Sequence, residues 1–282
     1  MPLLLLVDLD GVLYRGADPV PGVADVLARR AAAGDAVVYV TNNSMHYRAD
    51  YVRRLADMGA PVSPDRVVTA PRATALYIRE HHPAVGRVLT VGASGLDREL
   101  RDVGLDVVNA GFAAERMAKE GIDGIGAAGR PEAVVAGVDP QLTYLRLAAA
   151  ADCVRGGALF IATNRDPTYP TERWIRPGAG AIVSAIEVAS GVAPITIGKP
   201  GPLLIKEAAH AGGGDPREAI VIGDGIVTDL AAANNVGART ILMLTGVSSR
   251  EAADALPADE RPFALAAGAA ELDQVLAGLA AG

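Results

Sequence analysis

The sequence contains a single cysteine and four histidines among its 282 residues. One thiol, Cys153, cannot build an internal disulfide framework, and this scarcity is typical of a protein kept in a reducing cytoplasm. His81 and His82 are adjacent, so they cannot both face one side of a helix, and His46 and His210 are isolated. The pattern excludes a metal site made of cysteine or histidine ligands.

Basic residues and long apolar runs are also in short supply. Lys and Arg number 26 against 33 Asp and Glu, a formal net charge of -7. Nonspecific nucleic-acid binding needs a basic surface and is therefore disfavoured, although local charge at a site can still attract a small anionic substrate. The apolar start, residues 3–7, meets Asp8 and is too short for a signal peptide or a membrane span. We expect a soluble, cytoplasmic protein with neither nucleic-acid nor membrane partners.

The most informative stretch is the beginning of the chain. The apolar run of residues 3–7 predicts a strand buried on both faces of a parallel sheet. Asp8 and Asp10 end this run and, being two positions apart in extended chain, should flank one site. Gly11 lets the backbone turn sharply and approach a ligand closely. Taken alone, the same residues also fit a strand followed by an ordinary Asp-Gly turn.

Short apolar strands and amphipathic helices alternate along the rest of the chain, which predicts an α/β fold with a doubly wound, Rossmann-like parallel sheet. With 4% aromatic and 50% hydrophobic residues, the core should consist mainly of Ala, Val, Leu and Ile. The alternation starts afresh near residue 84 and returns to the first series near residue 194. We therefore predict a core domain of residues 1–83 and 194–282, with residues 84–193 as an inserted α/β domain.

Polar residues follow four of the predicted strands directly. Individually, Thr41 fits a helix cap, Lys199 a surface lysine and Asp224 a turn. Because the carboxyl ends of parallel strands meet at one edge of a sheet, we expect these groups to converge on a single cleft. The residues concerned are Asp8 and Asp10, Thr41 with Asn42 and Asn43, Lys199, and Asp224 with Asp229.

This set of groups favours phosphoryl chemistry. Carboxylates without a nearby cysteine or histidine prefer a hard cation, of which Mg²⁺ is the most plausible. A lysine with hydroxyl and amide donors suits a phosphate dianion. One carboxylate can attack phosphorus and form an aspartyl-phosphate, while a second protonates the leaving oxygen and then deprotonates the attacking water. The sequence thus predicts a metal-dependent phosphohydrolase.

Four segments resemble the four motifs of haloacid dehalogenase (HAD) superfamily phosphatases, in the same order. They are DLDGVLYRG (8–16), VTNNS (40–44), GKP (198–200) and GDGIVTD (223–229). Two further segments, 133–144 and 162–181, are similar to the large α/β cap of subfamily IIA, the para-nitrophenyl phosphatase, phosphoglycolate phosphatase and pyridoxal phosphate phosphatase group. The resemblance implies a HAD-type core with an inserted cap, here residues 84–193.

The resemblance also implies a role for each motif residue. Asp8 would be the nucleophile and Asp10 the general acid and base. Mg²⁺ would bind the Asp8 carboxylate, the Asp10 backbone carbonyl and Asp224, while Asp229 would orient the water around the metal or Lys199. Lys199 would offset developing charge. Phosphoryl oxygens would be held by Thr41, Asn42, Asn43 and Lys199.

The cap would exclude water and select the leaving group of a small-molecule phosphate ester. Within it, Asn164, Asp166 and Tyr169 are the candidates for substrate contact, although the first two can equally structure their loop and Tyr169 can simply pack. Members of this group usually carry a larger polar residue where this chain has Gly225. The family also implies a homodimer formed through the cap. The substrate itself stays open among pyridoxal phosphate, phosphoglycolate, glycerol phosphate, sugar phosphates and nucleotides.

Other functions fit these residues less well. A dehalogenase of the same fold needs neither Asp10 nor a metal, and a phosphomutase would keep both aspartates but fits the cap resemblance less well. A non-catalytic metabolite-binding or regulatory protein usually lacks the nucleophile or a metal ligand, and here all are present. A dinucleotide-binding enzyme is weaker still, because VGASG (91–95) lacks the full glycine fingerprint.

Overall fold

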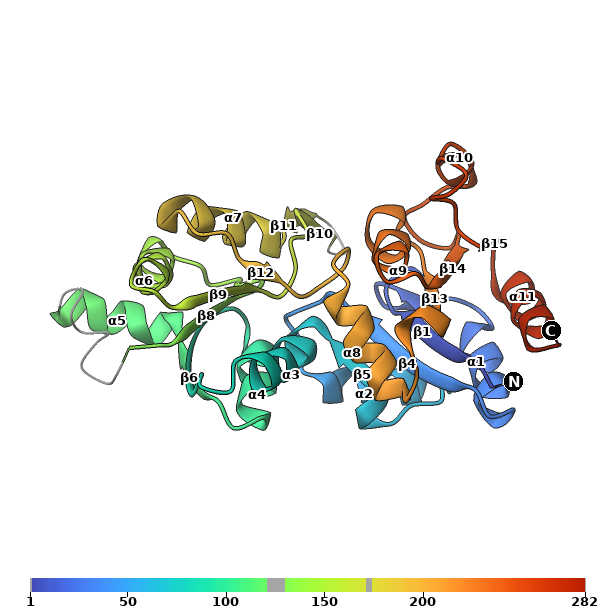
Figure 1. Ribbon diagram of the computed structural model, residues 1–282, viewed down its shortest axis with the longest axis horizontal. Helices are drawn as coiled ribbons and strands as arrows, with labels where there is room; N and C mark the ends of the chain where they lie inside the picture. The colour runs from blue at the N-terminus through green and yellow to red at the C-terminus, as the bar shows by residue number, and fades with distance from the viewer. Residues whose placement is uncertain (1, 121–129, 171–173, 282) are drawn as a thin grey trace. The chain divides into compact units, whose positions relative to one another are not determined.

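The computed structural model describes residues 2–120, 130–170 and 174–281, which divide into two compact units. Unit 1 comprises the chain up to Thr41, Ala49–Thr69, and Lys199 onwards; unit 2 comprises Asn42–Arg48 and Ala70–Gly198. Each unit is built around its own parallel sheet (Figure 1). Within the described residues, no helix combines the length and the apolar character needed to cross a membrane.

Unit 1 contains a six-stranded parallel sheet with the strand order β15-β14-β13-β1-β4-β5. Its strands are β1 (Leu4–Asp8), β4 (Ala36–Thr41), β5 (Val67–Thr69), β13 (Ile220–Gly223), β14 (Arg239–Met243) and β15 (Ala264–Ala266). A small hairpin, β2 (Tyr14–Arg15) with β3 (Asp18–Pro19), follows β1. The helices are α1 (Val23–Ala32), α2 (Arg48–Asp57, all but its first residue), α8 (Leu203–Gly212), α9 (Ala231–Val236), α10 (Arg250–Asp254) and α11 (Ala269–Ala281), with short turns η1 (Pro64–Arg66) and η3 (Pro216–Glu218) and the π-helical turn η4 (Ile226–Leu230).

The strand order reverses beside β1. The chain runs from β1 to β4 and β5 on one side, then returns to β13, β14 and β15 on the other. Asp8 pairs in register with Val40, and Val7 pairs with Ile222. The carboxyl ends of β1 and β13 therefore flank the point at which open α/β sheets bind their ligands.

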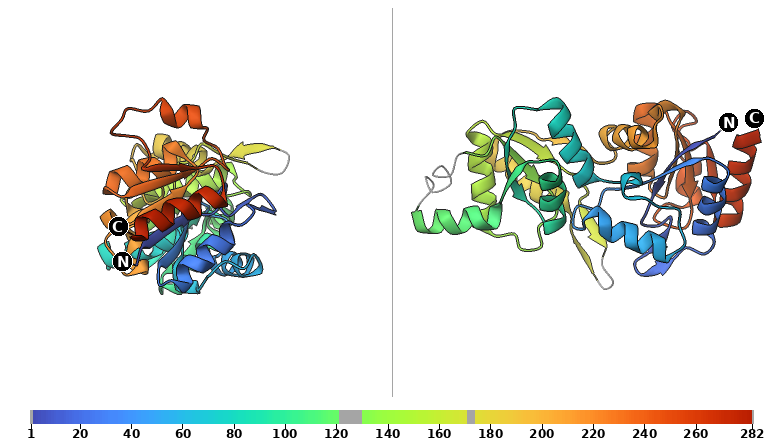
Figure 2. Two further views of the ribbon diagram at one scale, coloured as in Figure 1. Left: turned by 90° about the vertical axis from the view of Figure 1, so that its right-hand side faces the viewer. Right: turned by 90° about the horizontal axis from the view of Figure 1, so that it is seen from below.

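Aliphatic side chains fill one face of this sheet, as the composition predicts. Side chains from β1, β4, β13 and β14 pack there against α1, α2 and α11, and α1 and α11 lie side by side (Figure 2). The largest contributors include Leu5, Val7, Tyr39, Leu27, Leu55, Leu272 and Leu276, all nearly or fully buried. Helix α8 packs against β1, β4 and β5, with the backbone of Gly212 close to Leu4 and Val38. A sheet covered by apolar packing can hold charged groups at its carboxyl edge in fixed positions.

Unit 2 contains a five-stranded parallel sheet with the order β12-β9-β8-β6-β7. Its strands are β6 (Arg87–Val91), β7 (Asp106–Asn109), β8 (Ala133–Ala136), β9 (Leu159–Ala162) and β12 (Ile195–Thr196), with an antiparallel hairpin of β10 (Thr168–Pro170) and β11 (Ile175–Pro177). The helices are α3 (Ala70–His81), α4 (Ser94–Asp102), α5 (Ala110–Glu120), α6 (Tyr144–Arg155) and α7 (Ala179–Ser190).

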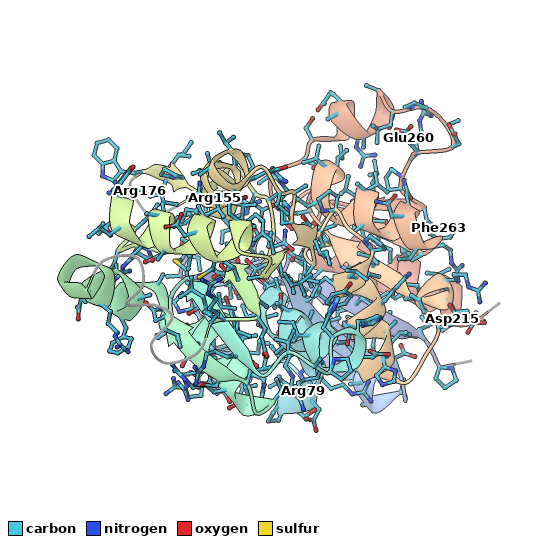
Figure 3. The ribbon with its side chains drawn as sticks, turned by 60° about the vertical axis from the view of Figure 1, so that its left-hand side comes forward. Arg79, Arg155, Arg176, Asp215, Glu260 and Phe263 are labelled. Atoms are coloured by element: carbon cyan, nitrogen blue, oxygen red, sulfur yellow. The ribbon has the colours of Figure 1, made fainter. Side chains whose placement is uncertain are left out.

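A second apolar core holds unit 2 together. Ala149, Ala150 and Val154 of α6 pack with α7 and the strands β6, β8 and β9. Charged side chains such as Arg79 of α3 and Arg155 of α6, labelled in Figure 3, are exposed. This two-sided pattern is the expected one for helices that cover a sheet.

The predicted α/β fold class with a parallel sheet is confirmed. The pattern gave no indication of helix α5 or of the two hairpins, and the π-helical turn η4 lies between Asp224 and helix α9. The compact division assigns α3, which packs against α4, to unit 2. The predicted boundaries at residues 84 and 193, and the roles of core and cap, stay predictions.

Candidate active site

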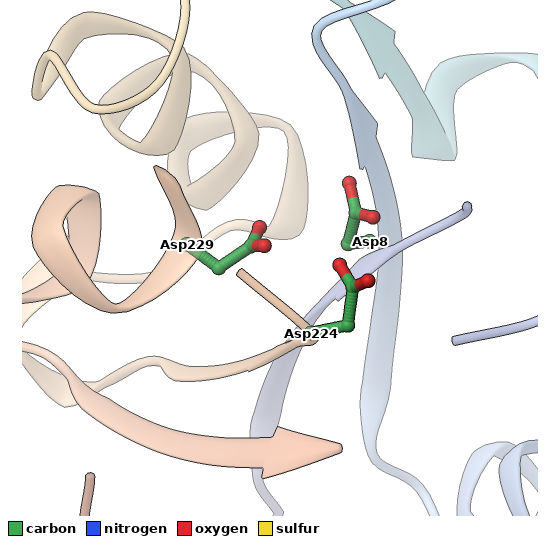
Figure 4. A group of neighbouring side chains, drawn as sticks. All are labelled: Asp8, Asp224 and Asp229. Atoms are coloured by element: carbon green, nitrogen blue, oxygen red, sulfur yellow. The ribbon is translucent and has the colours of Figure 1, made fainter. Parts of the chain in front are cut away.

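Three buried aspartates gather at the carboxyl edge of the sheet in unit 1. Asp8 is the last residue of β1, Asp224 follows β13 directly, and Asp229 lies in the turn η4. One carboxylate oxygen from each lies within 4.8 Å of the others. Figure 4 shows Asp224 and Asp229 approaching from their separate segments with their carboxylates toward Asp8. The sequence predicts that these aspartates converge on one place, and the structure brings these three together.

Lys199 joins two of these aspartates. Its Nζ atom donates to Asp8 Oδ1 at 2.5 Å and to Asp229 Oδ1 at 2.7 Å, and the residue is 3% exposed. Charge-assisted hydrogen bonds of this kind are short and strong. The ammonium group is thereby fixed directly beside the predicted nucleophile.

The charges in this cluster are unbalanced, and the imbalance suits a divalent cation. Three carboxylates face one ammonium group, so full ionisation would leave two uncompensated negative charges in a buried place. Carboxylate oxygens are the ligands that Mg²⁺ and Ca²⁺ prefer. The donor set therefore fits the metal that the resemblance implies.

Burial and charge shift the pKa values of these groups. Burial raises the pKa of Asp8 well above its usual range, Lys199 opposes that shift, and the neighbouring aspartates add to it. Burial, with Asp229 nearby, raises the pKa of Asp224 to about 6. Burial by itself would lower the pKa of Lys199, but the Asp229 and Asp8 carboxylates outweigh it and hold that pKa above its ordinary value, so the lysine stays cationic.

Two glycines allow the backbone to close around Asp224. Gly11 has a φ of 81°, and a Cβ atom there would lie 2.2 Å from Asp224 Oδ2. A Cβ atom on Gly246 would lie 1.8 Å from the same oxygen. The backbone N–H of Val247 donates to that oxygen at 2.8 Å, and Thr245 Oγ1 donates to the Gly11 carbonyl at 2.6 Å. Sequence reasoning noted the turn at Gly11 but missed Gly246, because no strand pattern marks the loop it occupies.

The remaining predicted residues of unit 1 are placed differently. Asp10 lies two residues beyond β1 and is exposed, outside the group of three carboxylates. Thr41 is the buried last residue of β4, the strand that pairs with β1. Asp8, the last residue of β1, is buried, whereas Asp10 is exposed; Leu9 between them is fully buried, and the positive φ of Gly11 follows.

Unit 2 brings together Asn42, Asn164 and Asp166. Asn42 Nδ2 lies 3.0 and 3.2 Å from the two carboxylate oxygens of Asp166 and donates to them. Asn164 Nδ2 donates to the backbone carbonyl of Asn42 at 2.7 Å, and the backbone N–H of Asp166 donates to Asn164 Oδ1 at 3.0 Å. Asn42 is thus held from its side chain and its backbone. The sequence placed all three near a substrate but gave no sign of this mutual contact.

Other residues of the segment Asn42–Arg48 are also anchored within unit 2. Asn43 Oδ1 accepts from the Met45 backbone N–H at 2.9 Å, which is a local turn. The buried Ser44 hydroxyl accepts from Val138 N at 3.0 Å, and the Arg48 backbone N–H donates to Glu99 Oε1 at 3.0 Å.

The last predicted residue of unit 2, Tyr169, is half-buried on β10 and pairs with Arg176 across the hairpin. Within the segment 162–181 that carries the cap resemblance, residues 171–173 lie outside the described residues.

Comparison with known proteins agrees with the geometry of the aspartate and lysine cluster. A family model described as haloacid dehalogenase-like hydrolase matches residues 5–106, and one described as HAD-hydrolase-like matches residues 196–272. The acid sugar phosphatase of Staphylococcus aureus (strain USA300) is 39% identical over 246 residues, which cover 87% of this chain and 88% of that protein.

Solved structures agree along almost the whole chain. The p-nitrophenyl phosphatase from Archaeoglobus fulgidus has a TM-score of 0.84 and 28% identity, covering 97% of this chain and 99% of its own. The glycerol phosphate phosphatase from Mycobacterium tuberculosis, solved in complex with magnesium, has a TM-score of 0.80 and 34% identity, covering 95% of this chain and 75% of its own. The chain therefore belongs to the haloacid dehalogenase-like hydrolases, and within them to the phosphoric monoester hydrolases.

Proposed function

We propose that this chain is a Mg²⁺-dependent phosphatase that hydrolyses a small-molecule phosphomonoester through an aspartyl-phosphate on Asp8. The observation that carries the proposal is the buried cluster in which Lys199 bridges Asp8 and Asp229 beside Asp224. A buried carboxylate, a fixed positive charge and further carboxylate oxygens at the carboxyl edge of one sheet support the proposal.

The first half of the reaction transfers the phosphoryl group to Asp8. A carboxylate oxygen of Asp8 attacks phosphorus, and the bond between phosphorus and the ester oxygen breaks. The carboxyl group of Asp10 gives its proton to the departing oxygen, so the product leaves as an alcohol. Asp10 is exposed, which suits it to this exchange of protons, whereas Asp8 is buried.

The second half returns the enzyme to its starting state. The Asp10 carboxylate takes a proton from a water molecule, whose oxygen attacks phosphorus and releases inorganic phosphate from Asp8. The ammonium group of Lys199, held at 2.5 Å from Asp8 Oδ1, offsets negative charge on the phosphoryl oxygens in both halves.

Asp8, the backbone carbonyl of Asp10 and Asp224 would hold Mg²⁺, with Asp229 supporting the site through Lys199. When bound, this cation supplies charge neutralisation for the phosphoryl group. Gly11 and Gly246 keep Asp224 in place by leaving it no room to turn away.

For the phosphoryl oxygens we propose the Thr41 hydroxyl and the Asn42 and Asn43 amides as donors. Asn164 and Asp166 would act on the substrate through Asn42, which they hold by hydrogen bonds. Tyr169 is our candidate for direct contact with the leaving group. Unit 2 would accordingly act as the cap and unit 1 as the catalytic core.

For the substrate we propose a small sugar phosphate or glycerol phosphate, in line with the names of the relatives. The relative from Archaeoglobus fulgidus is named for p-nitrophenyl phosphate, which makes that ester a convenient assay substrate. A cytoplasmic location and a homodimer formed through the cap complete the proposal.

Phosphate release from a panel of these esters, with Mg²⁺ and with a chelator, tests the proposal. We expect release that depends on Mg²⁺ and is lost with the chelator. Release that persists unchanged in chelator would contradict the metal dependence. Binding of Mg²⁺ without hydrolysis of any ester would favour a non-catalytic, metabolite-binding protein instead.

A further inference from the structure

The carboxylate of Asp229 is held on both of its oxygens. Oδ1 accepts the hydrogen bond from Lys199 Nζ at 2.7 Å. Oδ2 accepts from the Gly225 backbone N–H at 3.0 Å and from the Thr228 hydroxyl at 3.2 Å. Oδ2, the oxygen that is not bonded to Lys199, therefore accepts from two donors. One of them is the side chain of Thr228, which is not among the proposed catalytic groups.

The π-helical turn η4 creates this arrangement. The backbone N–H groups of Asp229 and Leu230 both donate to the Gly225 carbonyl, at 2.9 and 3.1 Å. The turn brings the backbone of Gly225 against the side chains of Thr228 and Asp229. Widened helical turns of this kind are rare and often found at functional sites.

Only a glycine leaves room for this contact. A Cβ atom at position 225 would lie 2.0 Å from Thr228 Oγ1 and 3.1 Å from Asp229 Oδ2. Real Cβ atoms do not approach a neighbour at 2.0 Å, so any side chain would force the Thr228 hydroxyl to rotate off Asp229. The hydrogen bond from Thr228 to Asp229 therefore depends on the absence of a side chain at position 225.

We propose that Thr228 is a positioning residue that fixes Asp229, and through it Lys199, and that Gly225 is the residue that permits this. The inference rests on the proposed function of the Asp8 and Lys199 pair. Thr228 touches neither substrate nor phosphorus; it acts through Asp229, whose other oxygen holds the ammonium group that contacts Asp8. A chain of hydrogen bonds then runs from Thr228 through Asp229 and Lys199 to the nucleophile.

Under this assignment, Gly225 contributes to the site by having no side chain. With a larger side chain at that position, the Asp229 carboxylate would lose its hydroxyl donor and keep the Gly225 backbone N–H. With glycine at position 225, the Thr228 hydroxyl restricts rotation of the Asp229 carboxylate. This keeps the Lys199 ammonium group at the distance that phosphoryl transfer needs.

Four variants test the proposal: T228A, T228S, G225A and the double variant G225A/T228A. Loss of one hydrogen bond to a charged group should lower kcat for p-nitrophenyl phosphate in T228A by about tenfold, with KM within about threefold of wild type. T228S keeps the hydroxyl and should stay within about twofold of wild type. The exposed neighbour Val227 supplies a matched control, since V227A should leave kcat unchanged.

The double variant separates this contact from two independent defects. G225A alone should lose at least as much activity as T228A, because the new Cβ displaces the hydroxyl. In G225A/T228A the oxygen that would clash is gone, so kcat should stay within about twofold of T228A rather than fall by the product of the two losses.

Two kinetic results would overturn the proposal: T228S as impaired as T228A, or losses in kcat that multiply in the double variant. The same cycle measured by urea unfolding should show the same non-additivity, because the clash and the hydrogen bond exist without substrate. That second measurement decides the contact even if the wild type releases no phosphate, an outcome that would refute the proposed function separately. Additive unfolding effects would overturn the inference by themselves.

Discussion

The Asp8–Lys199–Asp229 cluster of unit 1 and the Asn42–Asn164–Asp166 network of unit 2 are held in different ways. The first is ionic, with one ammonium group between two buried carboxylates at 2.5 and 2.7 Å. The second depends on amide donors, with Asn42 bonded to one carboxylate and held by one neighbouring amide. Removing Lys199 from the first would leave its buried carboxylates uncompensated, while removing one partner from the second frees an amide that can turn toward water.

The difference separates chemistry from placement. Under the proposed function, the charges in unit 1 would provide a nucleophile and charge stabilisation, so a substitution there should change the rate of bond breaking. The amides in unit 2 can only orient a hydrogen-bond donor, so a substitution there should have a smaller effect on activity. The predictions below, from the largest expected effect to the smallest, test this separation.

Asp8→Asn should reduce phosphate release by at least about a thousandfold, because an amide cannot replace the carboxylate that attacks phosphorus. Burial raises the pKa of Asp8, so the ionised group is costly in the folded state. Without added metal, the melting temperature of the variant should therefore equal or exceed that of the wild type. Kinetic assays and thermal unfolding of the same preparations provide both values. Activity close to wild type would rule out Asp8 as the nucleophile.

Asp224→Ala should raise the Mg²⁺ concentration needed for half-maximal activity by about tenfold or more, because one carboxylate ligand is lost. Titration of activity against Mg²⁺ measures this shift. The matched comparison is Asp215→Ala, which removes an aspartate that pairs with Arg217 on the surface. An unchanged Mg²⁺ requirement in the Asp224 variant would place the metal elsewhere.

Gly246→Ala should weaken Mg²⁺ activation in the same direction but less, by about three- to tenfold, because the new Cβ would lie 1.8 Å from Asp224 Oδ2 and displace that carboxylate. Gly268→Ala is the control, since a Cβ there meets nothing within 4 Å. Equal Mg²⁺ titrations for the two alanine variants would show that the loop at Gly246 does not constrain Asp224.

Asp166→Asn should have the smallest effect, about two- to fivefold on KM with kcat nearly unchanged, because Asn42 loses a charged acceptor but keeps an amide oxygen. Glu187→Gln removes a surface carboxylate from the same unit, where it pairs with Arg165, and should leave both constants unchanged. A fall in kcat as large as that of Asp8→Asn would place Asp166 in the chemistry and end the separation drawn above.

Asp8 and Asp224 were predictable from local patterns because one ends and the other directly follows a short buried strand. Apolar runs end at Asp8 and Asp224, and the rule that parallel strands share a carboxyl edge brings those ends together. The same rule says nothing about which oxygen Lys199 contacts. It also does not predict the exposure of Asp10, which lies two residues beyond Asp8 and outside the group of three carboxylates.

The amide network could not be predicted, because its members are 122 and 124 residues apart and no pattern links them. Helix α5 and the hairpins were missed for a related reason. The hairpins are short, and α5 packs against α6, a contact that local pattern does not show. The contact of Thr228 with Asp229 inside the π-helical turn η4 depends on the missing side chain at Gly225, which becomes visible only when these residues are placed in space.

The division of the chain at Thr41 and Asn42 has a consequence for protein engineering. Residues 42–48 belong to unit 2, where Ser44 accepts a hydrogen bond from Val138 and Arg48 donates one to Glu99. A chimera that exchanges only residues 70–198 for those of a relative would separate this segment from the partners that hold it. Transplants meant to alter substrate choice should therefore carry both segments, with crossover points after Thr41, Arg48, Thr69 and Gly198.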